Sequence, residues 1–269
     1  SQELIRCSVW LEMSSRAFLK ERSLGRIFAG HPWIYRSDVA HIENAPADGG
    51  EITVRTEDGK YVGNGFYNSQ SRIPIRIFSR SKEKLDESFF RKRILDAKAL
   101  RENIPEFFNR QSPIGNRQLS PSCRLVWSEA DFLPGLIVDR YEDALVLQTL
   151  TLALDQRKNL IMELLKEIEQ PSAIVERNDV SSRAFEGLPL QKGFLFCEPN
   201  PVRAIGMGEA KFEVDLLQGQ KTGAYLDQIA NQQLFGRLAR GRRVLDCFTY
   251  QGGFALHAAL AGAAHVEAW

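Results

Sequence analysis

The sequence predicts an α/β protein of several domains: a small β-barrel, an α+β middle domain and the opening of a parallel α/β sheet. Short alternating strands separated by turns predict the barrel between residues 16 and 81. A strand pair, a helix and another strand predict the middle domain between residues 123 and 205. Residues 244–269 read as strand, loop, helix and strand, an order that opens a parallel sheet.

Length and composition limit the classes of protein. A chain of 269 residues suggests two or three compact units. Its 43% hydrophobic and 26% charged residues are typical of a soluble globular protein, and no apolar run approaches the roughly 20 residues of a membrane helix. Ser1–Ser15 lacks a signal-peptide core and is predicted to be an irregular lead-in. Because 35 Lys and Arg nearly balance 34 Asp and Glu, nucleic acid binding requires a local basic patch.

The cysteines argue against a metal site. They are far apart, no C-x-x-C pair occurs, and the chain has only four histidines. We therefore expect neither a metal nor a disulfide framework, and we expect a reducing, cytoplasmic location without membrane contact. The cysteines are Cys7, Cys123, Cys197 and Cys247.

The segment Arg16–Arg36 is locally basic, with five Lys and Arg residues against one acid, Glu21. Aromatic residues are interleaved with the basic ones. Basic side chains contact phosphates and aromatic rings stack on bases, so the segment predicts RNA contacts. A solvated basic face over a small aromatic core is the alternative. The residues predicted to contact RNA are Lys20, Arg22, Arg26, Trp33 and Arg36.

The barrel strands follow this segment. Glu51–Arg55 alternates, Asp58–Gly59 predicts a hairpin turn, and Tyr61–Val62 resumes the strand. Hydrophobic residues alternate again over Ile73–Phe78. Residues 82–122 then predict a helix over Lys82–Asn103 and a linker rich in proline and glycine. The predicted buried face of the helix consists of Leu85, Phe89, Ile94, Leu95 and Leu100.

In the middle domain, Leu136–Asp139 and Ala144–Thr149 predict a hairpin. Asp155 is predicted to be the N-cap of the next helix, and Ala173–Glu176 a further strand. Four charged residues look like a catalytic set, but we interpret them as hairpin ends and surface ion pairs. They are Asp131, Asp139, Glu176 and Arg177.

Residues 206–269 are predicted to begin the parallel sheet. Alternation around Phe212 and Val214 predicts a half-exposed strand that leads into the polar turn Gly219–Gly223. The helix after this turn carries Asp227 and Gln228 at its start. The expected elements that follow are a strand at Val244–Cys247, a loop at Phe248–Gly253, a helix at Phe254–Leu260 and a strand near His265.

The loop after Val244–Cys247 distinguishes two ligand classes. A dinucleotide requires G-x-G-x-x-G, because the backbone must approach a pyrophosphate. Here only Gly252 and Gly253 lack side chains. A phosphate-free ligand such as S-adenosylmethionine does not impose this demand, and Asp246 could accept hydrogen bonds from its amino group. A buried strand and a tight turn without a ligand is the alternative.

Two motifs, read together, resemble one family. G-Q-K-T-G-x-x-L-D-Q at Gly219–Gln228 and V-L-D-C-F-T-Y-Q-G-G-F at Val244–Phe254 are similar to the RlmI-type class I methyltransferases. These enzymes contain a PUA domain and make 5-methylcytosine in large-subunit ribosomal RNA. G-x-G-F-Y-N at Gly63–Asn68 and H-P-W-I-Y at His31–Tyr35 resemble the PUA domain, an RNA-binding module. The resemblance begins at about residue 16.

This resemblance implies S-adenosylmethionine as cofactor, ribosomal RNA as partner and a Rossmann-like methyltransferase sheet. It also implies that both motif loops line the cofactor or face the target base. The cofactor-binding residues expected on this basis are Lys221, Thr222, Asp227, Asp246, Phe248, Thr249 and Gly252.

Methylation at cytosine C5 uses a cysteine thiolate that adds to C6. None of the four cysteines matches the family's catalytic motif, and the resemblance implies that this cysteine lies beyond Trp269. We therefore assign no catalytic residue, expect an incomplete methyltransferase domain and expect this chain alone to be inactive.

Two other functions stay open. A non-enzymatic RNA-binding module would rely on Arg16–Arg36 alone. An NAD-dependent oxidoreductase shares the strand, loop and helix, although Phe248 and Tyr250 count against it. The sequence determines neither the target nucleotide nor the oligomeric state, so a homodimer also stays open.

Overall fold

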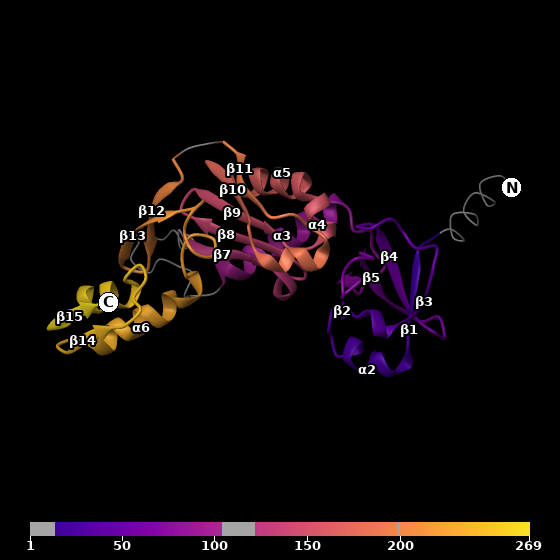
Figure 1. Ribbon diagram of the computed structural model, residues 1–269, viewed down its shortest axis with the longest axis horizontal. Helices are drawn as coiled ribbons and strands as arrows, with labels where there is room; N and C mark the ends of the chain where they lie inside the picture. Colours follow the sequence, from indigo (N-terminus) through magenta and orange to yellow (C-terminus); the bar gives the residue numbers. More distant parts are fainter. Residues whose placement is uncertain (1–13, 104–121, 198–199) are drawn as a thin grey trace.

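A computed structural model describes residues 14–103, 122–197 and 200–269 of the chain. Three units follow one another along its long axis: a β-rich N-terminal unit, a central sheet with helices, and a smaller C-terminal unit (Figure 1). Cys7, most of the predicted lead-in and nearly all of the predicted linker lie outside the described residues. Within the described ranges, no helix is long and apolar enough to cross a membrane.

The N-terminal unit is a six-stranded mixed sheet with the order β2-β6-β5-β4-β1-β3. Its strands are β1 (Arg16–Leu19), β2 (Trp33–Ile34), β3 (Val39–Glu43), β4 (Glu51–Thr56), β5 (Tyr61–Tyr67) and β6 (Ile75–Ser79). Alternate side chains such as Ile52 and Val54 are fully buried in one core. At Gly65 a Cβ atom would lie 2.1 Å from the carbonyl oxygen of Arg76, so only glycine fits between β5 and β6.

The basic segment contains a helix that the sequence analysis did not predict, α2 (Glu21–Phe28). It is short, and Gly25 in its interior lowers its helix propensity. Burial compensates for this low propensity, because Ile27 is fully buried in the barrel core. A 3-10 turn, η1 (Arg36–Asp38), follows β2.

Helix α3 (Glu87–Glu102) connects the barrel to the central sheet. It begins later than predicted because the Asp86 carboxylate accepts hydrogen bonds from two backbone N–H groups of its first turn. The predicted buried face is wrong at Leu95 and Leu100, which are 45% and 51% exposed. The repeat of 3.6 residues per turn brings another set of residues to the core. This set is Phe89, Phe90, Ile94, Ala97 and Arg101.

The central unit is a five-stranded mixed sheet with the order β11-β10-β9-β8-β7. Its elements are β7 (Ser122–Trp127), η3 (Ser128–Asp131), β8 (Leu136–Tyr141), β9 (Ala144–Thr149), α4 (Leu152–Gln156), α5 (Lys158–Glu169), β10 (Ala173–Asn178), η4 (Ser181–Glu186) and β11 (Gln191–Phe196). The predicted hairpin and the predicted strand β10 are confirmed. Asp155 is not the predicted N-cap: it lies inside α4, where its carboxylate accepts hydrogen bonds from Thr149 and Arg183.

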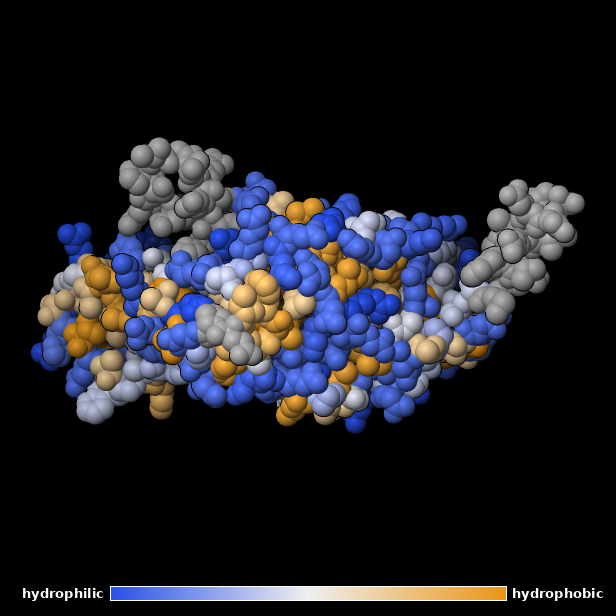
Figure 2. Space-filling view, turned by 90° about the horizontal axis from the view of Figure 1, so that it is seen from above, coloured by the Kyte–Doolittle hydropathy of each residue, from blue (hydrophilic) through white to orange (hydrophobic). Residues whose placement is uncertain are grey.

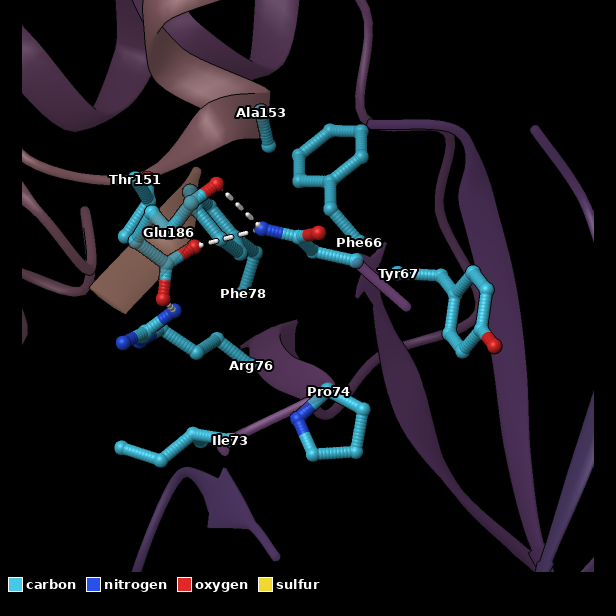
Figure 3. A pocket seen from close by; sticks show the side chains of 10 residues that line it. Phe66, Tyr67, Ile73, Pro74, Arg76, Phe78, Thr151, Ala153 and Glu186 are labelled. Atoms are coloured by element: carbon cyan, nitrogen blue, oxygen red, sulfur yellow. Dashed lines mark hydrogen bonds and ion pairs between the residues drawn. The ribbon is translucent and has the colours of Figure 1, made fainter. Parts of the chain in front are cut away.

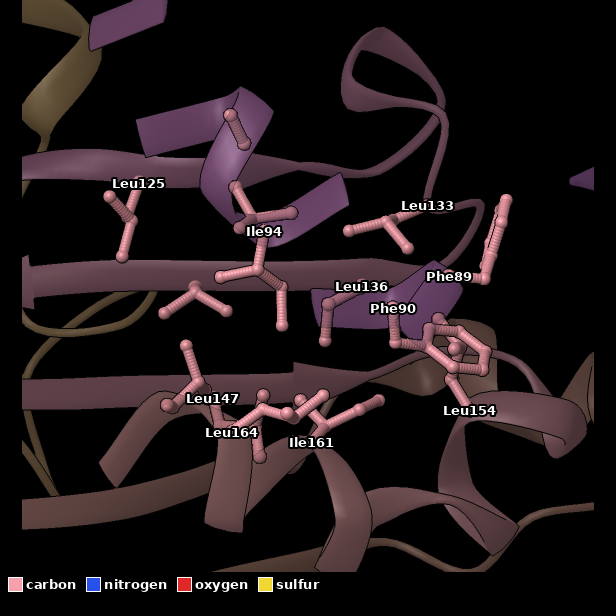
Figure 4. Close-up of a cluster of buried hydrophobic side chains, with 14 of the residues drawn as sticks. Phe89, Phe90, Ile94, Leu125, Leu133, Leu136, Leu147, Leu154, Ile161 and Leu164 are labelled. Atoms are coloured by element: carbon pink, nitrogen blue, oxygen red, sulfur yellow. The ribbon is translucent and has the colours of Figure 1, made fainter. Parts of the chain in front are cut away.

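The central sheet is buried on both faces. Leu147 faces a core formed with α3 and α5 (Figure 4), and Leu145 belongs to the same core. Val146 faces the hairpin of β12 (Val202–Met207) and β13 (Ala210–Asp215). Each fully buried leucine contributes roughly 1.5–3 kcal/mol, so two cores make this sheet a rigid support for the loops attached to it. The boundary predicted between residues 205 and 206 falls inside β12.

The C-terminal unit contains the predicted strand, loop, helix and strand. Its elements are η5 (Leu226–Gln228), α6 (Ile229–Ala239), β14 (Arg243–Asp246), α7 (Gly253–Leu260) and β15 (His265–Ala268). Strands β14 and β15 pair in parallel, with Val244 opposite Val266. Figure 2 shows hydrophobic side chains at the surface of this end of the molecule, where Leu238, Leu260 and Trp269 are more than half exposed.

Candidate functional site

The loop Gly219–Gly223, named here the anchored loop, is held to the central sheet by a chain of buried hydrogen bonds. The hydroxyl of Thr222 donates to Asp139 Oδ2 at 2.6 Å. The Thr222 hydroxyl has only one proton, which is engaged with Asp139, so Thr222 Oγ1 accepts from the Tyr141 hydroxyl at 2.9 Å. The Tyr141 hydroxyl in turn accepts from the Ala224 N–H at 3.0 Å. Burial raises the pKa of Tyr141, which keeps its hydroxyl protonated and able to donate.

Two arginines complete this attachment. Arg124 forms a bidentate ion pair with Asp139, with Nε 2.8 Å from Oδ1 and Nη2 3.0 Å from Oδ2. Arg177 Nη1 donates to the carbonyl oxygens of Leu216 and Gly219 at 3.1 and 2.9 Å. Asp139 is fully buried, and charged hydrogen bonds are strong in such a place because water does not compete for them.

The interpretation of Asp131, Asp139, Glu176 and Arg177 as surface pairs is wrong. All four are buried, with exposed fractions between 0 and 7%. Asp131 forms an ion pair with Arg101 and Glu176 with a lysine of α5, while the other two hold the anchored loop. Asp139, Glu176 and Arg177 lie in strands with apolar neighbours, a context that is compatible with burial but does not distinguish it from a strand end at the surface.

The two glycines of the anchored loop are required for different reasons. At Gly219 a Cβ atom would lie 2.6 Å from the Asp215 carbonyl oxygen. Any residue with a side chain would therefore push these two backbone segments apart. Gly223 has a φ of +145°, and a Cβ atom there would also lie 3.3 Å from the Tyr141 ring. Both positions therefore exclude side chains.

The loop Phe248–Gly252, named here the strand-end loop, depends mainly on local bonds. Asp246 Oδ2 accepts hydrogen bonds from Thr249 Oγ1 at 2.7 Å and from a backbone N–H of the first turn of α7 at 3.1 Å. Phe248 and Tyr250 have φ values of +64° and +52°, which cost a non-glycine residue energy. Phe248 is 98% exposed. Such strained, exposed residues are typical of ligand-binding loops.

The two loops contact each other. The Gln220 N–H donates to the Tyr250 hydroxyl at 3.1 Å, and the Tyr225 ring packs edge-on against Tyr250 with centroids 5.5 Å apart. Lys221 Nζ lies 4.1 Å from the Tyr225 ring centroid and 3.1 Å from Asp227 Oδ1. The two motifs that are separate in the sequence thus form one surface.

The predicted cofactor residues lie in two different environments on this surface. Lys221 and Asp227 are exposed beside the strand-end loop, whereas Thr222 is 2% exposed and its hydroxyl faces the central sheet. Burial acts to raise the pKa of Asp227, but the hydrogen bond and charge of Lys221 outweigh it and lower that pKa. Asp246, Thr249 and Gly252 lie together where β14 meets α7.

The predicted RNA residues lie around α2 and η1 of the barrel. Lys20 and Arg22 both donate to the Ser37 carbonyl oxygen. This acceptor is neutral, so the two hydrogen bonds do not cancel the positive charges of the side chains. Arg26 pairs with Asp38 at 2.6 Å. Arg36 Nη2 donates to the carbonyl oxygens of Ser69 and Ser71 at 2.6 and 3.2 Å. Trp33 Nε1 donates to Glu129 Oε1 of the central unit at 2.7 Å. The four basic residues therefore help to hold the barrel together, whereas Trp33 joins the barrel to the central unit.

A buried polar joint between the barrel and the central unit was not predicted. Glu186 Oε1 accepts a hydrogen bond from Arg76 Nη1 at 2.7 Å (Figure 3). The same oxygen accepts from Ser71 Oγ at 2.6 Å. Its Oε2 accepts from Asn68 Nδ2 at 3.0 Å. The pocket beside these groups is also lined by Phe66 of the barrel. Because both carboxylate oxygens have partners, we interpret the joint as a contact that orients the barrel.

The cysteines of the described ranges give no metal site or obvious nucleophile. No group of three or more His, Cys, Asp or Glu residues within these ranges could hold a metal ion. Burial raises the pKa of Cys123 to about 11, so its thiol stays protonated near neutral pH. Cys197 and Cys247 are exposed.

Comparisons with known proteins agree with this arrangement. A PUA-like domain family matches residues 18–80. Ribosomal RNA large subunit methyltransferase I of Shewanella amazonensis is 40% identical to the chain over 260 residues, which are 95% of this chain and 62% of that protein. The protein of the same name from Aeromonas hydrophila is 35% identical over 257 residues, which are 94% and 62% of the two chains. The resemblance found in the sequence is thereby confirmed.

A solved structure shows the same fold. The crystal structure of SMU.776, a proposed methyltransferase complexed with SAH, superposes with a TM-score of 0.75 at 18% identity. The superposition covers 94% of this chain and 62% of that one, and it confirms the predicted fold class. The chain spans about 62% of the length of the curated relatives described above.

Proposed function

Because the chain resembles ribosomal RNA large subunit methyltransferase I over 95% of its length, we propose that it serves methylation of ribosomal RNA with S-adenosylmethionine as cofactor. We assign the reaction to cytosine C5 of large-subunit RNA and its location to the cytoplasm. Residues 16–81 are the RNA-binding PUA-like domain, residues 123–205 the middle domain, and residues 206–269 the start of the methyltransferase domain. The observation that carries the proposal is the contact between the two motif loops.

The strand-end loop suits S-adenosylmethionine better than a dinucleotide. A pyrophosphate must approach bare backbone, and the loop carries side chains at Phe248, Thr249, Tyr250 and Gln251 before its first glycine. At Gly252 the nearest atom to an added Cβ would be 3.8 Å away, which leaves room beside the start of α7. Asp246 uses Oδ2 for its two hydrogen bonds, so Oδ1 can accept from an amino group. The cofactor supplies the methyl group when it is bound.

The residues of this chain bind and orient rather than react. Asp246 receives the amino group, and Phe248 and Thr249 border the same space. Lys221 and Asp227 close the opposite side as a charged pair at 3.1 Å. Thr222 acts through the anchored loop, since its hydroxyl is bonded to Asp139. We assign no nucleophile, and the raised pKa of Cys123 argues against this thiol.

Calorimetry with S-adenosylmethionine and with NAD tests this proposal. We expect the first to bind and the second not to bind. Asp246→Ala should weaken binding at least tenfold, about 1.4 kcal/mol, because a charged hydrogen bond is lost. Asp58→Ala, at an exposed carboxylate of the barrel, is the matched control. Binding of NAD alone would support the oxidoreductase instead. RNA binding without either cofactor would support the non-enzymatic module.

A cellular test addresses the modified base. Mass spectrometry of ribosomal RNA nucleosides from cells without the gene should show less 5-methylcytosine in the large subunit. Unchanged 5-methylcytosine would refute the assignment of the base while leaving the cofactor proposal intact.

A further inference from the structure

The turn η3, between β7 and β8, carries two exposed aromatic residues that the proposed function does not use. Trp127 precedes the turn and Phe132 follows it, and they are 56% and 62% exposed. Exposed ring faces are the surfaces on which proteins stack unpaired bases, with a gain of roughly 1–3 kcal/mol per base. This turn is therefore a candidate contact surface outside the two motif loops.

Buried hydrogen bonds and an ion pair fix the backbone of the turn. Asp131 forms a buried ion pair with Arg101 of α3, with Nη2 2.7 Å from Oδ2, and also accepts the Trp127 N–H at 2.5 Å. Ser128 Oγ accepts the Gly135 N–H at 2.7 Å, and the neighbouring Leu133 is fully buried. Because the backbone is already fixed, little conformational entropy is lost when a ligand stacks on the rings.

Arginine guanidinium groups lie on both rings. Arg93 lies between Phe89 and Phe132, with its guanidinium carbon 5.1 Å from each ring centroid. Its Nε is buried and has no hydrogen-bond partner in the described part of the chain. Arg124 lies 5.7 Å from the Trp127 ring, but its charge is matched by Asp139. The surface thus offers two aromatic residues that are more than half exposed, and one cation without a carboxylate partner among the described residues.

The region around the turn is also linked to the barrel and to the anchored loop. Glu129 within η3 accepts the hydrogen bond from Trp33 of the barrel. Arg124, beside Trp127, is joined through Asp139 to Thr222 of the anchored loop. Hydrogen bonds thus tie the η3 region to the barrel on one side and to the anchored loop on the other.

We propose that Arg93, Arg124, Trp127 and Phe132, named here the η3 surface, bind an unpaired segment of the RNA substrate. Bases stack on Trp127 and Phe132, and a phosphate lies beside Arg93. An unpaired segment fits better than a duplex, because duplexes are bound chiefly through many phosphate contacts. On this surface only Arg93 is a cation without a carboxylate partner among the described residues. The proposal rests on the proposed function only in taking RNA as the substrate.

Fluorescence anisotropy with a labelled single-stranded oligoribonucleotide of about 12 nucleotides, and with a duplex of equal length, tests the η3 surface. Phe132→Leu should weaken single-strand binding at least about fivefold, whereas Phe132→Trp should preserve it. Arg93→Ala should reduce the log–log salt slope by about 0.7. Lys92→Ala is the control, since it removes one positive charge from the same helix at a residue paired with Asp96.

The outcomes separate this inference from the proposed function. If Phe132→Leu and Arg93→Ala bind the single strand like the unchanged chain, the η3 surface is refuted although the barrel still binds RNA. If the chain binds neither RNA, the RNA-binding part of the proposed function fails as well. If an acidic peptide of equal charge displaces the single strand equally well, the surface binds charge rather than bases. A larger loss for the duplex than for the single strand would also contradict base stacking.

Discussion

The anchored loop and the strand-end loop contact each other, but different interactions hold them. The anchored loop depends on Asp139, Tyr141 and Arg177, which come from β8 and β10 of the central sheet. The strand-end loop depends on Asp246 at the end of its own strand, and its tip residue Phe248 is 98% exposed. One half of the candidate site is therefore fixed by buried residues of the central sheet. The other is fixed by Asp246 and by the Trp269 carbonyl oxygen, which accepts the Thr249 N–H at 3.0 Å.

This difference suggests that the two loops differ in rigidity. Buried, fully paired polar networks specify one conformation, since breaking any bond leaves a buried group without a partner. Loops with exposed side chains and few buried contacts have low local stability and adapt to a ligand more easily. We therefore expect the anchored loop to be preformed and the strand-end loop to become ordered around the cofactor.

The largest expected effect is a difference in unfolding free energy between substitutions of Asp139 and of Asp246. Asp139→Ala should lower the free energy of unfolding by about 3–5 kcal/mol, because it leaves Arg124 and Thr222 without their buried partner. Asp246→Ala removes a partly buried local contact and should cost only about 1–2 kcal/mol. Urea unfolding of both variants measures the difference. Equal losses would show that the two loops are held alike.

The next prediction concerns the glycine at the end of the anchored loop. Gly223→Ala should cost at least about 1 kcal/mol more than Gly241→Ala. Both glycines have positive φ, +145° and +69°, but only Gly223 has neighbours within 4 Å of an added Cβ. Thermal unfolding of the two variants measures this difference, which combines the contact with Tyr141 and the larger backbone strain at a φ of +145°. A similar cost at both positions would mean that the Tyr141 contact is not tight.

A smaller effect on stability is expected in the strand-end loop. Phe248→Ala should change the free energy of unfolding by less than about 0.5 kcal/mol, because the side chain is exposed. The same variant should bind S-adenosylmethionine several-fold more weakly in calorimetry. Strong destabilisation would indicate that Phe248 is packed in solution, which would remove the contrast between the loops.

The smallest effect is a change in one pKa where the loops meet. Lys221→Ala should raise the pKa of Asp227 toward its ordinary value, whereas Lys211→Ala should not. A lowered pKa in the folded state adds stability above about pH 4, and this stability is lost as the pH falls through the lowered pKa. Asp227 is 57% exposed, so its contribution is small and NMR titration of its carboxyl carbon is the suitable measurement.

Patterns that depend on near neighbours were readable from the sequence. Three of the barrel strands (β4, β5 and β6), the hairpin of β8 and β9, and the strand, loop and helix from β14 to α7 follow from alternation, turn residues and glycines. Strands β1, β2 and β3 were not predicted. The family resemblance rested on the two motifs, and it too was correct. Local signals failed where burial overrode propensity, as in α2, and where a polar residue outside the pattern fixed the start of α3.

The tertiary structure alone decided which charged residues are buried. The sequence placed Asp139 and Arg177 at strand ends, but only the packing of β12 and β13 on the central sheet covers them. The same packing turned Thr222 from an expected ligand contact toward Asp139. Partners such as Trp33 and Glu129, or Arg76 and Glu186, are about 100 residues apart. A sequence pattern reports which faces are apolar, whereas contacts between distant elements depend on how those faces are stacked in space.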